Sequence, residues 1–561
     1  MCGIAGFVST DPKYNSKKIV RDMLSSIRHR GPDQDGVYKK DAFTIGTVRL
    51  SIIDTDKHVI PYKTPDGAVA IVYNGEIYNH EDVRRSLGGR YPFDTKSDAE
   101  TVLYNYVEKG VSSFGDYNGM YAFAIYDARK RELYVVRDRA GEKAVYYTLQ
   151  KSFFAFASEI KALCALREPV FNEGCLSYKA YEFNTGEETV FKDIYALMPG
   201  EYLSVNGKLD VKKHAYWKIW DNLIDVPDNL RKIESRLSDL IVDSIELRTR
   251  NRVHSYGTFV SGGVDSALVA CIARPDHIYT CHYEVDGYDE LPYAELVARK
   301  IKKKLIVVKP RPEDFERTRR KIIYHLDTPC TWTSFSLWML LERAHRDIKV
   351  VLSGDGADEI FAGYYRYHLL HHDEQIRDLK ALERYSYLID RYYGSPVERY
   401  VKLVNRCENR YDRKVLKYLE DTVGRYFSRA GHHYIHAMGM TDFYTTMQEL
   451  MQFADRINMA FSVENRSPFL DHRLIQYAFS MPQKYKIRNG VTKWIVKRIA
   501  KKFIPREIIE RVDKRGFSAP VNHWFGWGKK GTYDRSEYRK LVFNDWADVF
   551  GVKGSGGGRD R

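Results

Sequence analysis

The sequence predicts a two-domain protein whose halves belong to different fold classes. Up to about residue 205, short apolar strands alternate with turns and short helices, which indicates an α+β domain over residues 2–205. From residue 231 strands alternate with amphipathic helices, which predicts an α/β domain over residues 231–550. Turn-rich residues 206–230 form the predicted linker, and Gly-rich residues 551–561 a flexible tail. The length of 561 residues agrees with two or three domains.

The first half contains several compact apolar runs that read as strands. Residues 68–73 form one, and Asn74-Gly75 after it has the composition of a turn. Residues 120–126 and 132–137 read as a pair of strands around a polar turn, and 153–157 is a further strand.

The second half opens with helical periodicity over 231–249 and continues as strand, Gly-rich loop and helix. Such alternation predicts a parallel sheet with crossover helices. The expected strands are 255–260, 277–283, 305–308 and 350–353, and the expected helices are 267–273 and 293–300. The Tyr-rich stretch 368–448 is expected to be mostly helical.

Composition excludes several classes of function. The net charge of +14 comes from scattered basic residues, so we interpret it as a solvated surface and expect no nucleic-acid partner. Seven widely spaced cysteines without a Cys-x-x-Cys pair support neither a disulfide framework nor a zinc site. No apolar run is long enough for a membrane span and no signal-peptide pattern is present, which predicts a cytoplasmic protein.

Cys2 is the first candidate for chemistry. Removal of Met1 would leave a thiol and a free α-amino group on one residue, and an α-amine with a pKa of about 7.7–8.0 can serve as a base near neutrality. A nucleophile activated by its own amine is a known catalytic arrangement. Taken alone, a cysteine at this position is more often just a small residue near the start of a strand.

Two loops in the second half are candidates for binding a nucleotide. Residues 261–266 (SGGVDS) lie between a strand and a helix, where glycines and a helix N-terminus suit phosphate oxygens. Asp265 within this loop suggests a bridging Mg²⁺, and Asp358 in the acidic loop 353–359 (SGDGADE) is a second carboxylate for it. The plainer alternatives are a Gly turn with a helix cap and a surface turn held by Asp side chains.

Many ordered motifs together resemble the glutamine-hydrolysing asparagine synthetase family, also called asparagine synthetase B. They extend over nearly the whole chain: 1–7 (MCGIAGF), 28–33 (RHRGPD), 49–54 (RLSIID), 73–79 (YNGEIYN), 97–100 (SDAE), 137–143 (RDRAGEK), 261–266, 353–359, 464–473 (ENRSPFLDHR) and 514–517 (KRGF). The resemblance implies an α+β N-terminal-nucleophile glutaminase sandwich followed by an α/β ATP-pyrophosphatase domain, similar to adenine nucleotide α hydrolases.

The resemblance also assigns roles to residues. In the first half Cys2 is the implied nucleophile, and Asn74 with the Gly75 backbone is the implied oxyanion hole. Arg49, Asn74, Glu76 and Asp98 are the residues expected to hold glutamine.

In the second half, Lys493 and Asp355 are the implied catalytic residues, and Asp265 and Asp358 the implied ligands of Mg²⁺. The residues expected to contact ATP are Val260, Ser261, Gly262, Gly263, Asp265, Ser266, Ser353 and Gly354.

The implied reaction is ATP-dependent transfer of the glutamine amide nitrogen to the side chain of L-aspartate through an acyl-adenylate. Its products are asparagine, glutamate, AMP and pyrophosphate. The expected partners are small-molecule substrates, and a homodimer is expected by analogy alone.

Three departures from the family pattern concern the acceptor. Asp355 replaces the usual Glu and Ala362 stands where Gly is usual. Residues 326–334, called here the acceptor stretch, lie where members of the family contact the acceptor, and they lack an expected Arg. A sugar uronic acid or a peptide carboxylate is therefore an alternative acceptor. Two other classes stay open, a glutaminase-type transferase without ATP and a binding protein on a decayed scaffold, although loop 261–266, Lys493 and Cys2 argue against them.

Overall fold

The computed structural model describes residues 2–52, 54, 58–250, 254–285, 288–329, 332–371, 395–431, 433–511, 519–527 and 536–552. Several features predicted from the sequence lie outside these residues. They are the 514–517 motif, Cys330 and Thr331 of the acceptor stretch, residues 372–394 of the Tyr-rich stretch, and the tail from 553.

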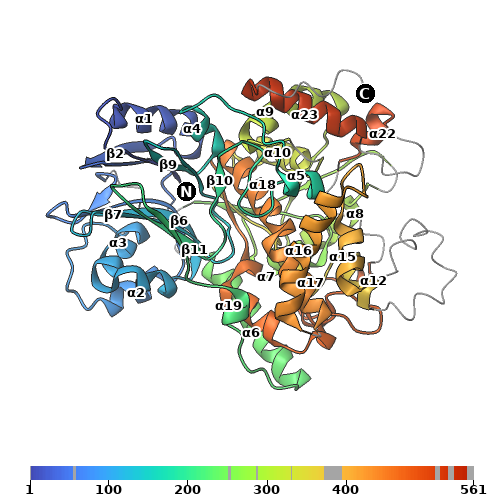
Figure 1. The fold of residues 1–561 in the computed structure, drawn as a ribbon. Helices are drawn as coiled ribbons and strands as arrows, with labels where there is room; N and C mark the ends of the chain where they lie inside the picture. The colour runs from blue at the N-terminus through green and yellow to red at the C-terminus, as the bar shows by residue number, and fades with distance from the viewer. Residues whose placement is uncertain are drawn as a thin grey trace.

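The first half is a sandwich of two six-stranded antiparallel sheets between two layers of helices (Figure 1). The first sheet has the order β10-β8-β9-β1-β3-β2 and the second β12-β11-β7-β6-β5-β4. Apolar side chains such as Ile4, Val72, Ala124 and Phe156 fill the space between the sheets. Helices α1 and α4 cover the first sheet, and α2 and α3 cover the second.

The bounds of these elements are as follows. The strands are β1 (Cys2–Val8), β2 (Gln34–Lys40), β3 (Phe43–Arg49), β4 (Tyr62–Lys63), β5 (Val69–Ile77), β6 (Gly119–Asp127), β7 (Glu132–Arg137), β8 (Tyr146–Leu149), β9 (Phe154–Ala157), β10 (Tyr195–Ala196), β11 (Glu201–Asn206) and β12 (Val211–Ala215). The helices are α1 (Ser16–Ser26), α2 (His80–Ser86), α3 (Asp98–Lys109), α4 (Ile160–Cys164) and α5 (Leu176–Tyr181).

The predicted turn at Asn74-Gly75 is wrong, because both residues lie inside β5. The strand continues to Ile77, and Asn74 and Gly75 pair with Ala122 and Tyr121 of β6. Pairing with an adjacent strand overrides the local turn preference of the dipeptide. Gly75 is still required, since a Cβ there would lie 2.2 Å from the Met120 carbonyl oxygen.

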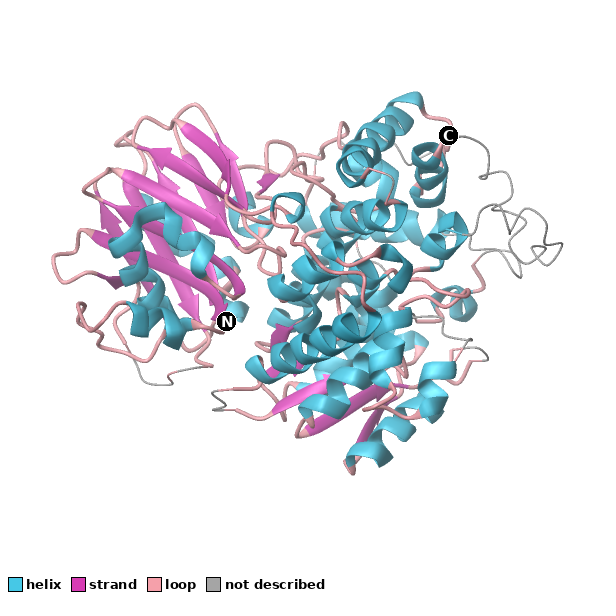
Figure 2. Cartoon of the chain, turned by 90° about the horizontal axis from the view of Figure 1, so that it is seen from below, coloured by secondary structure: helices cyan, strands magenta, loops and turns pink. Residues whose placement is uncertain are grey.

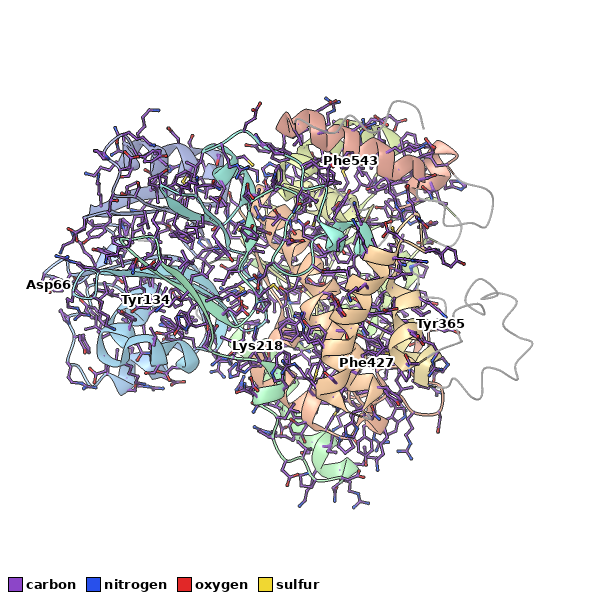
Figure 3. The ribbon with its side chains drawn as sticks, in the orientation of Figure 1. Asp66, Tyr134, Lys218, Tyr365, Phe427 and Phe543 are labelled. Atoms are coloured by element: carbon purple, nitrogen blue, oxygen red, sulfur yellow. The ribbon has the colours of Figure 1, made fainter. Side chains whose placement is uncertain are left out.

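Part of the predicted linker is structured. Strand β12 pairs with β11, so residues 211–215 belong to the second sheet. Lys218 follows at the junction of the halves (Figure 3), where its Nζ lies 2.9 Å from Glu201 and 5.6 Å from the ring centre of Tyr444. The domain boundaries themselves stay predictions.

The second half contains the predicted parallel sheet, with the order β15-β14-β13-β16-β17. The chain leaves β13 toward β14 on one side and reaches β16 on the other. Loops that follow β13 and β16 therefore meet at a topological switch point, where open α/β sheets bind ligands. The strands are β13 (Tyr256–Phe259), β14 (His277–Cys281), β15 (Leu305–Val308), β16 (Val350–Leu352) and β17 (Glu464–Arg466).

Helices surround this sheet, and the Tyr-rich stretch is mostly helical where it is described (Figure 2). No helix among the described residues is both long enough and apolar enough to cross a membrane. The helices are α6 (Leu230–Leu247), α7 (Val264–Ala273), α8 (Leu291–Ile301), α9 (Pro312–Leu326), α10 (Trp332–Ala344), α11 (Ala357–Phe361), α12 (Tyr365–His371), α15 (Pro396–Val404), α16 (Arg413–Ala430), α17 (Tyr434–Tyr444), α18 (Thr446–Ala460), α19 (His472–Ser480), α20 (Trp494–Ala500), α21 (Arg506–Glu510), α22 (Val521–Phe525) and α23 (Ser536–Phe550).

The two halves share one apolar core. Leu50 and Met120 of the first half belong to the same buried cluster as Val264 and Phe469 of the second. The interface is therefore packed as a protein interior is, which fixes the two halves relative to each other.

Candidate active sites

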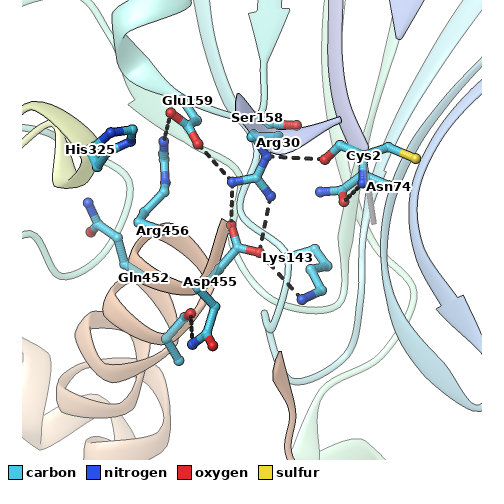
Figure 4. Close-up of polar contacts among 12 residues, drawn as sticks. Cys2, Arg30, Asn74, Lys143, Ser158, Glu159, His325, Gln452, Asp455 and Arg456 are labelled. Carbon is cyan, nitrogen blue, oxygen red and sulfur yellow. Dashed lines mark hydrogen bonds and ion pairs between the residues drawn. The ribbon is translucent and has the colours of Figure 1, made fainter. Parts of the chain in front are cut away.

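Cys2 lies at the first position of β1, opposite Arg49 of β3. Its backbone N–H donates to Asn74 Oδ1 at 3.0 Å (Figure 4). Asn74 is completely buried, and its Nδ2 has no hydrogen-bond partner among the described residues. An unused buried amide donor is costly, so its position beside Cys2 suggests a ligand that accepts a hydrogen bond there.

A cavity of about 50 Å³ opens beside Cys2. It brings together five of the six predicted residues of the first site: Cys2, Arg49, Gly75, Glu76 and Asp98. The sequence analysis did not single out other residues of its lining, including Tyr62, Tyr73 and Ser97. Tyr73 precedes Asn74 in the motif 73–79, and this position is a signal from which its place in the pocket could have been predicted.

The charged residues of this cavity are held by their neighbours. Asp98 Oδ2 accepts from the Tyr73 hydroxyl at 2.5 Å and from the Ile77 N–H at 2.9 Å. Arg49 donates to Gln34 Oε1 at 2.6 Å. Burial raises the pKa of Glu76 well above its usual value, while nearby Arg466 opposes that change. The cavity thus combines a thiol, an arginine and two carboxyl groups, which suits a zwitterionic amino acid.

The second site begins with the loop between β13 and α7. The structure starts α7 at Val264, three residues before the predicted start, so Asp265 and Ser266 lie in its first turn. The N–H groups of a first helical turn have no partner within the helix, which favours an anion at this position. Gly262 has φ of 64°, a conformation that favours glycine. Ser266 Oγ donates to the Gly263 carbonyl at 3.2 Å and closes the loop.

Lys493 lies between loop 261–266 and the acidic loop 353–359 and forms an ion pair with each. Its Nζ lies 2.5 Å from Asp265 Oδ2 and 2.6 Å from Asp358 Oδ1, and the side chain is buried. The two carboxylates raise the pKa of Lys493 against the effect of its burial. Residues 228 positions apart in the chain therefore meet at the switch point of the sheet.

Asp355 lies beside this group of charges. Its Oδ2 accepts from Ser353 Oγ at 2.8 Å. Burial is the main cause that raises the pKa of Asp355, and Asp358 and Asp265 raise it further. Gly354 approaches closely, because a Cβ there would lie 2.8 Å from the Cβ of Asp265.

Two residues that follow the acidic loop, Ala362 and Gly363, have backbone positions at which a glycine is favoured. A Cβ on Gly363 would lie 1.8 Å from Asp358 Oδ1 and 2.0 Å from Lys493 Cε, so glycine is required there. Sequence reasoning did not assign Gly363 a role. Ala362 has φ of 58°, the left-handed region in which glycine avoids a penalty of about 1 kcal/mol.

The residues present fit a Mg²⁺ ion that is also bound by phosphates. Asp265 Oδ1 is buried and has no hydrogen-bond partner among the described residues, which leaves a carboxylate oxygen available. No group of three or more His, Cys, Asp or Glu side chains in the described part of the chain is arranged around a metal position. Mg²⁺ held through nucleotide phosphates needs only one or two carboxylates.

The sandwich that begins with Cys2 and the parallel sheet with its nucleotide-type loop together define a two-domain glutamine amidotransferase. The first half matches the glutamine amidotransferase domain family over residues 1–217, and the second the asparagine synthase family over residues 236–537. The chain belongs to the asparagine synthase family, and it is a glutamine-hydrolysing ligase. The predicted family and fold class are thereby confirmed.

Curated relatives cover most of the chain. It is 29% identical to asparagine synthetase [glutamine-hydrolyzing] 1 of Bacillus subtilis, over 93% of this chain and 88% of the relative. It is 30% identical to putative asparagine synthetase [glutamine-hydrolyzing] 2 of Methanocaldococcus jannaschii, over 65% and 76%. It is also 26% identical to amidase chyE of Penicillium rubens, over 97% and 93%.

Proposed function

We propose that the protein transfers ammonia from glutamine to the side-chain carboxylate of L-aspartate, which MgATP activates as an acyl-adenylate. The observation that carries the proposal is the convergence of Lys493, Asp265 and Asp358 in a chain that also holds Cys2 in a pocket. A glutamine-hydrolysing pocket alone would need no such second site.

In the first site the Cys2 thiolate attacks the side-chain amide carbon of glutamine. The α-amino group of Cys2, freed by loss of Met1, takes the thiol proton and passes it to the departing ammonia. Negative charge develops on the amide oxygen, and Asn74 Nδ2 with the Gly75 N–H would stabilise it. The buried Asn74 Nδ2, which has no hydrogen-bond partner among the described residues, supports this role. Water then hydrolyses the thioester and releases glutamate.

The ends of glutamine suit the charged residues of the pocket. Arg49 would pair with the α-carboxylate, because a guanidinium binds a carboxylate through two parallel hydrogen bonds. Asp98 and Glu76 would hold the ammonium group. Asp98 is already oriented by Tyr73 and Ile77, so little reorganisation is needed on binding.

In the second site the loops after β13 and β16 would hold ATP. The contacts would come from Val260, Ser261, Gly262, Gly263, Asp265, Ser266, Ser353 and Gly354. Lys493 would stabilise charge on the reacting phosphate, and Asp265 and Asp358 would hold Mg²⁺, which when bound neutralises phosphate charge.

The chemistry of the second site has two steps. An oxygen of the acceptor carboxylate attacks the α-phosphorus and pyrophosphate leaves. Ammonia then attacks the acyl carbon, AMP leaves, and the nitrogen gives up a proton. The ionised carboxylate of Asp355 is the group that we assign to accept this proton, since a raised pKa makes it a stronger base.

A second class of acceptor is the alternative to L-aspartate. Asp355 is one methylene shorter than the usual Glu, and residues 326–334 contain no Arg. Both features are compatible with an acceptor other than aspartate, such as a sugar uronic acid or a peptide carboxylate, which is the alternative to the main proposal. Small-molecule partners are expected in either case, and the homodimer stays a prediction.

The test is pyrophosphate release with MgATP and glutamine, with and without L-aspartate, by the wild type, Cys2→Ala and the control Cys407→Ala. Aspartate should trigger release together with asparagine formation. Cys2→Ala should retain synthesis only from added ammonia, and Cys407→Ala should behave as the wild type. Glutamine hydrolysis without any response to aspartate would reject this acceptor and favour the alternative.

A further inference from the structure

Seven charged side chains are buried together where the two halves meet. Figure 4 shows Arg30, Lys143, Glu159, Asp455 and Arg456 among them. None is more than 5% exposed. The first half contributes four and the second half three: Arg30, Lys143, Glu159 and Lys161, then Asp327, Asp455 and Arg456. The proposed chemistry uses none of them, so this group, called here the interface ion cluster, needs a separate explanation.

One arm of the cluster reaches the nucleophile. Arg30 Nε donates to the backbone carbonyl of Cys2 at 3.1 Å. The same guanidinium lies 2.9 Å from Asp455 Oδ2, on α18 of the second half, and 2.8 Å from Glu159 Oε1. Arg30 is completely buried, so it links the backbone of Cys2 directly to a helix of the other domain.

The other arm reaches the end of α9. Arg456 follows Asp455 on α18 and lies 3.2 Å from Glu159 and 2.9 Å from Asp327 Oδ2. Lys161 lies 2.7 Å from Asp327 Oδ1, and the Ile160 N–H donates to Asp327 Oδ2 at 2.7 Å. The carboxylate of Asp327 is therefore held from both halves.

Asp327 also fixes the backbone that follows α9. It has φ of 62°, its N–H donates to the Ile323 carbonyl, and its carbonyl accepts from Trp546 Nε1 at 3.0 Å. Next to it, Gln452 of α18 donates to the Leu326 carbonyl at 2.9 Å. Leu326 and Asp327 begin the acceptor stretch 326–334, which the family resemblance implies is in contact with the acceptor.

Such a cluster is a poor way to gain stability alone. Removing several charges from water is expensive, and their mutual attraction repays this only when the geometry is well satisfied. Loss of one partner leaves another charge buried and uncompensated, so the members hold one another in a single arrangement. A movement at one end therefore alters the balance at the other.

We propose that the interface ion cluster positions Cys2 according to the state of the acceptor stretch, through Arg30–Asp455 on one side and Glu159–Arg456–Asp327 on the other. Arg30 and Asp455 are positioning residues for the nucleophile. Asp327 is the end of the cluster that senses the acceptor. This coupling rests on the proposed function, because it needs an acceptor bound near residues 326–329, the described start of the acceptor stretch.

The experiment uses the full chain with Asp455→Asn, Asp327→Asn, the conservative Asp455→Glu, and the control Asp545→Asn. Asp545, on α23, is 3% exposed and pairs with Arg320 of α9 at 2.9 Å, so it is a matched buried carboxylate outside the cluster. The main readout is the factor by which MgATP and acceptor raise glutamine hydrolysis. Ammonia-dependent pyrophosphate release shows that each variant has folded its second half.

We expect MgATP and acceptor to raise glutamine hydrolysis by a factor of at least threefold in the wild type and in Asp545→Asn. The same factor should be near one in Asp455→Asn and Asp327→Asn. Asp455→Glu should recover at least half of the wild-type factor. Ammonia-dependent release should stay within about twofold in Asp455→Asn, Asp455→Glu and Asp545→Asn, whose residues lie outside the acceptor stretch. Loss of the factor in Asp545→Asn as well, or its retention in either cluster variant, would overturn the proposal.

A separate measurement needs neither ATP nor acceptor. With glutamine alone, Asp455→Asn should lower kcat/KM for hydrolysis at least tenfold, and Asp545→Asn should not. An unchanged kcat/KM in Asp455→Asn rejects its positioning role whatever the acceptor is. Failure of the proposed function has a different signature, namely no aspartate-dependent pyrophosphate release by the wild type even with ammonia.

Discussion

The guanidinium of Arg466, in β17 of the second half, lies 3.5 Å from the carboxylate of Glu76, in the glutamine-type pocket of the first half. Arg466 also pairs with Glu464 at 2.6 Å, and its carbonyl accepts from the Ser353 N–H at 3.0 Å. One residue therefore touches the wall of the first site and the strand that carries the acidic loop of the second.

Arg466→Gln should destabilise the protein by about 3–5 kcal/mol, because it leaves two buried carboxylates without their shared cation. The measurement is the free energy of unfolding in urea. Arg506→Gln is the control, since Arg506 is 84% exposed in its pair with Glu510 and such surface pairs contribute about 0–1 kcal/mol. Equal unfolding free energies for the two variants would contradict this assignment.

Asn74→Ala should lower kcat for glutamine hydrolysis by about 10²–10³, the usual effect of removing one oxyanion donor. The reason is that Asn74 Nδ2 is a buried donor beside Cys2 with no hydrogen-bond partner in the part of the chain that the structure describes. Steady-state glutamate production measures it, and ammonia-dependent synthesis should persist. Asn105→Ala, at another fully buried asparagine of the same half, should hydrolyse glutamine normally. Hydrolysis by Asn74→Ala within threefold of the wild type would reject the role.

Lys493→Met should abolish pyrophosphate release from either nitrogen source, by at least about 10²-fold, and leave glutamine hydrolysis intact. The ammonium group lies between Asp265 and Asp358, so its loss brings two carboxylates together without compensation. Pyrophosphate and glutamate assays on one sample separate the two sites.

The matched control for this prediction is Lys486→Met. Lys486 is 1% exposed, and its Nζ lies 4.3 Å from the ring centre of Phe479. Burial lowers its pKa well below the usual value. Loss of that amine should therefore leave pyrophosphate release unchanged, and a loss as large as in Lys493→Met would indicate a general packing defect.

Local sequence patterns predicted the elements whose backbone depends mainly on residues close to them in the chain. Loop 261–266 and the strand before it follow from glycines and apolar periodicity, and the parallel sheet follows from the alternation of strands and helices. The Asn74-Gly75 turn failed because the partner strand β6, some forty residues later, decides that backbone. Arg30 and Asp455 are 425 positions apart, and no local pattern encodes such a pair.

Glu142 provides a pH-dependent prediction. It is 4% exposed in the loop after β7, and burial raises its pKa to about 8. Arg248, Lys143 and the Ser467 N–H oppose the increase, and Asp138 adds to it. In the unfolded chain the carboxyl has its usual pKa of about 4.3. Between these values the folded protein keeps a proton that the unfolded chain has lost, so rising pH lowers the free energy of unfolding.

Glu142→Gln has no proton to lose, so the variant should become more stable relative to the wild type as pH rises from about 4.5 to about 8. Each pH unit in that interval should add up to about 1.4 kcal/mol to the difference. Urea unfolding at several pH values measures it, with Glu246→Gln, at an exposed glutamate of α6, as the control. A difference that stays constant from pH 5 to pH 8 would show that Glu142 is already ionised in the folded protein. The buried carboxyl would then be compensated by Arg248 and Lys143 rather than neutralised by its proton.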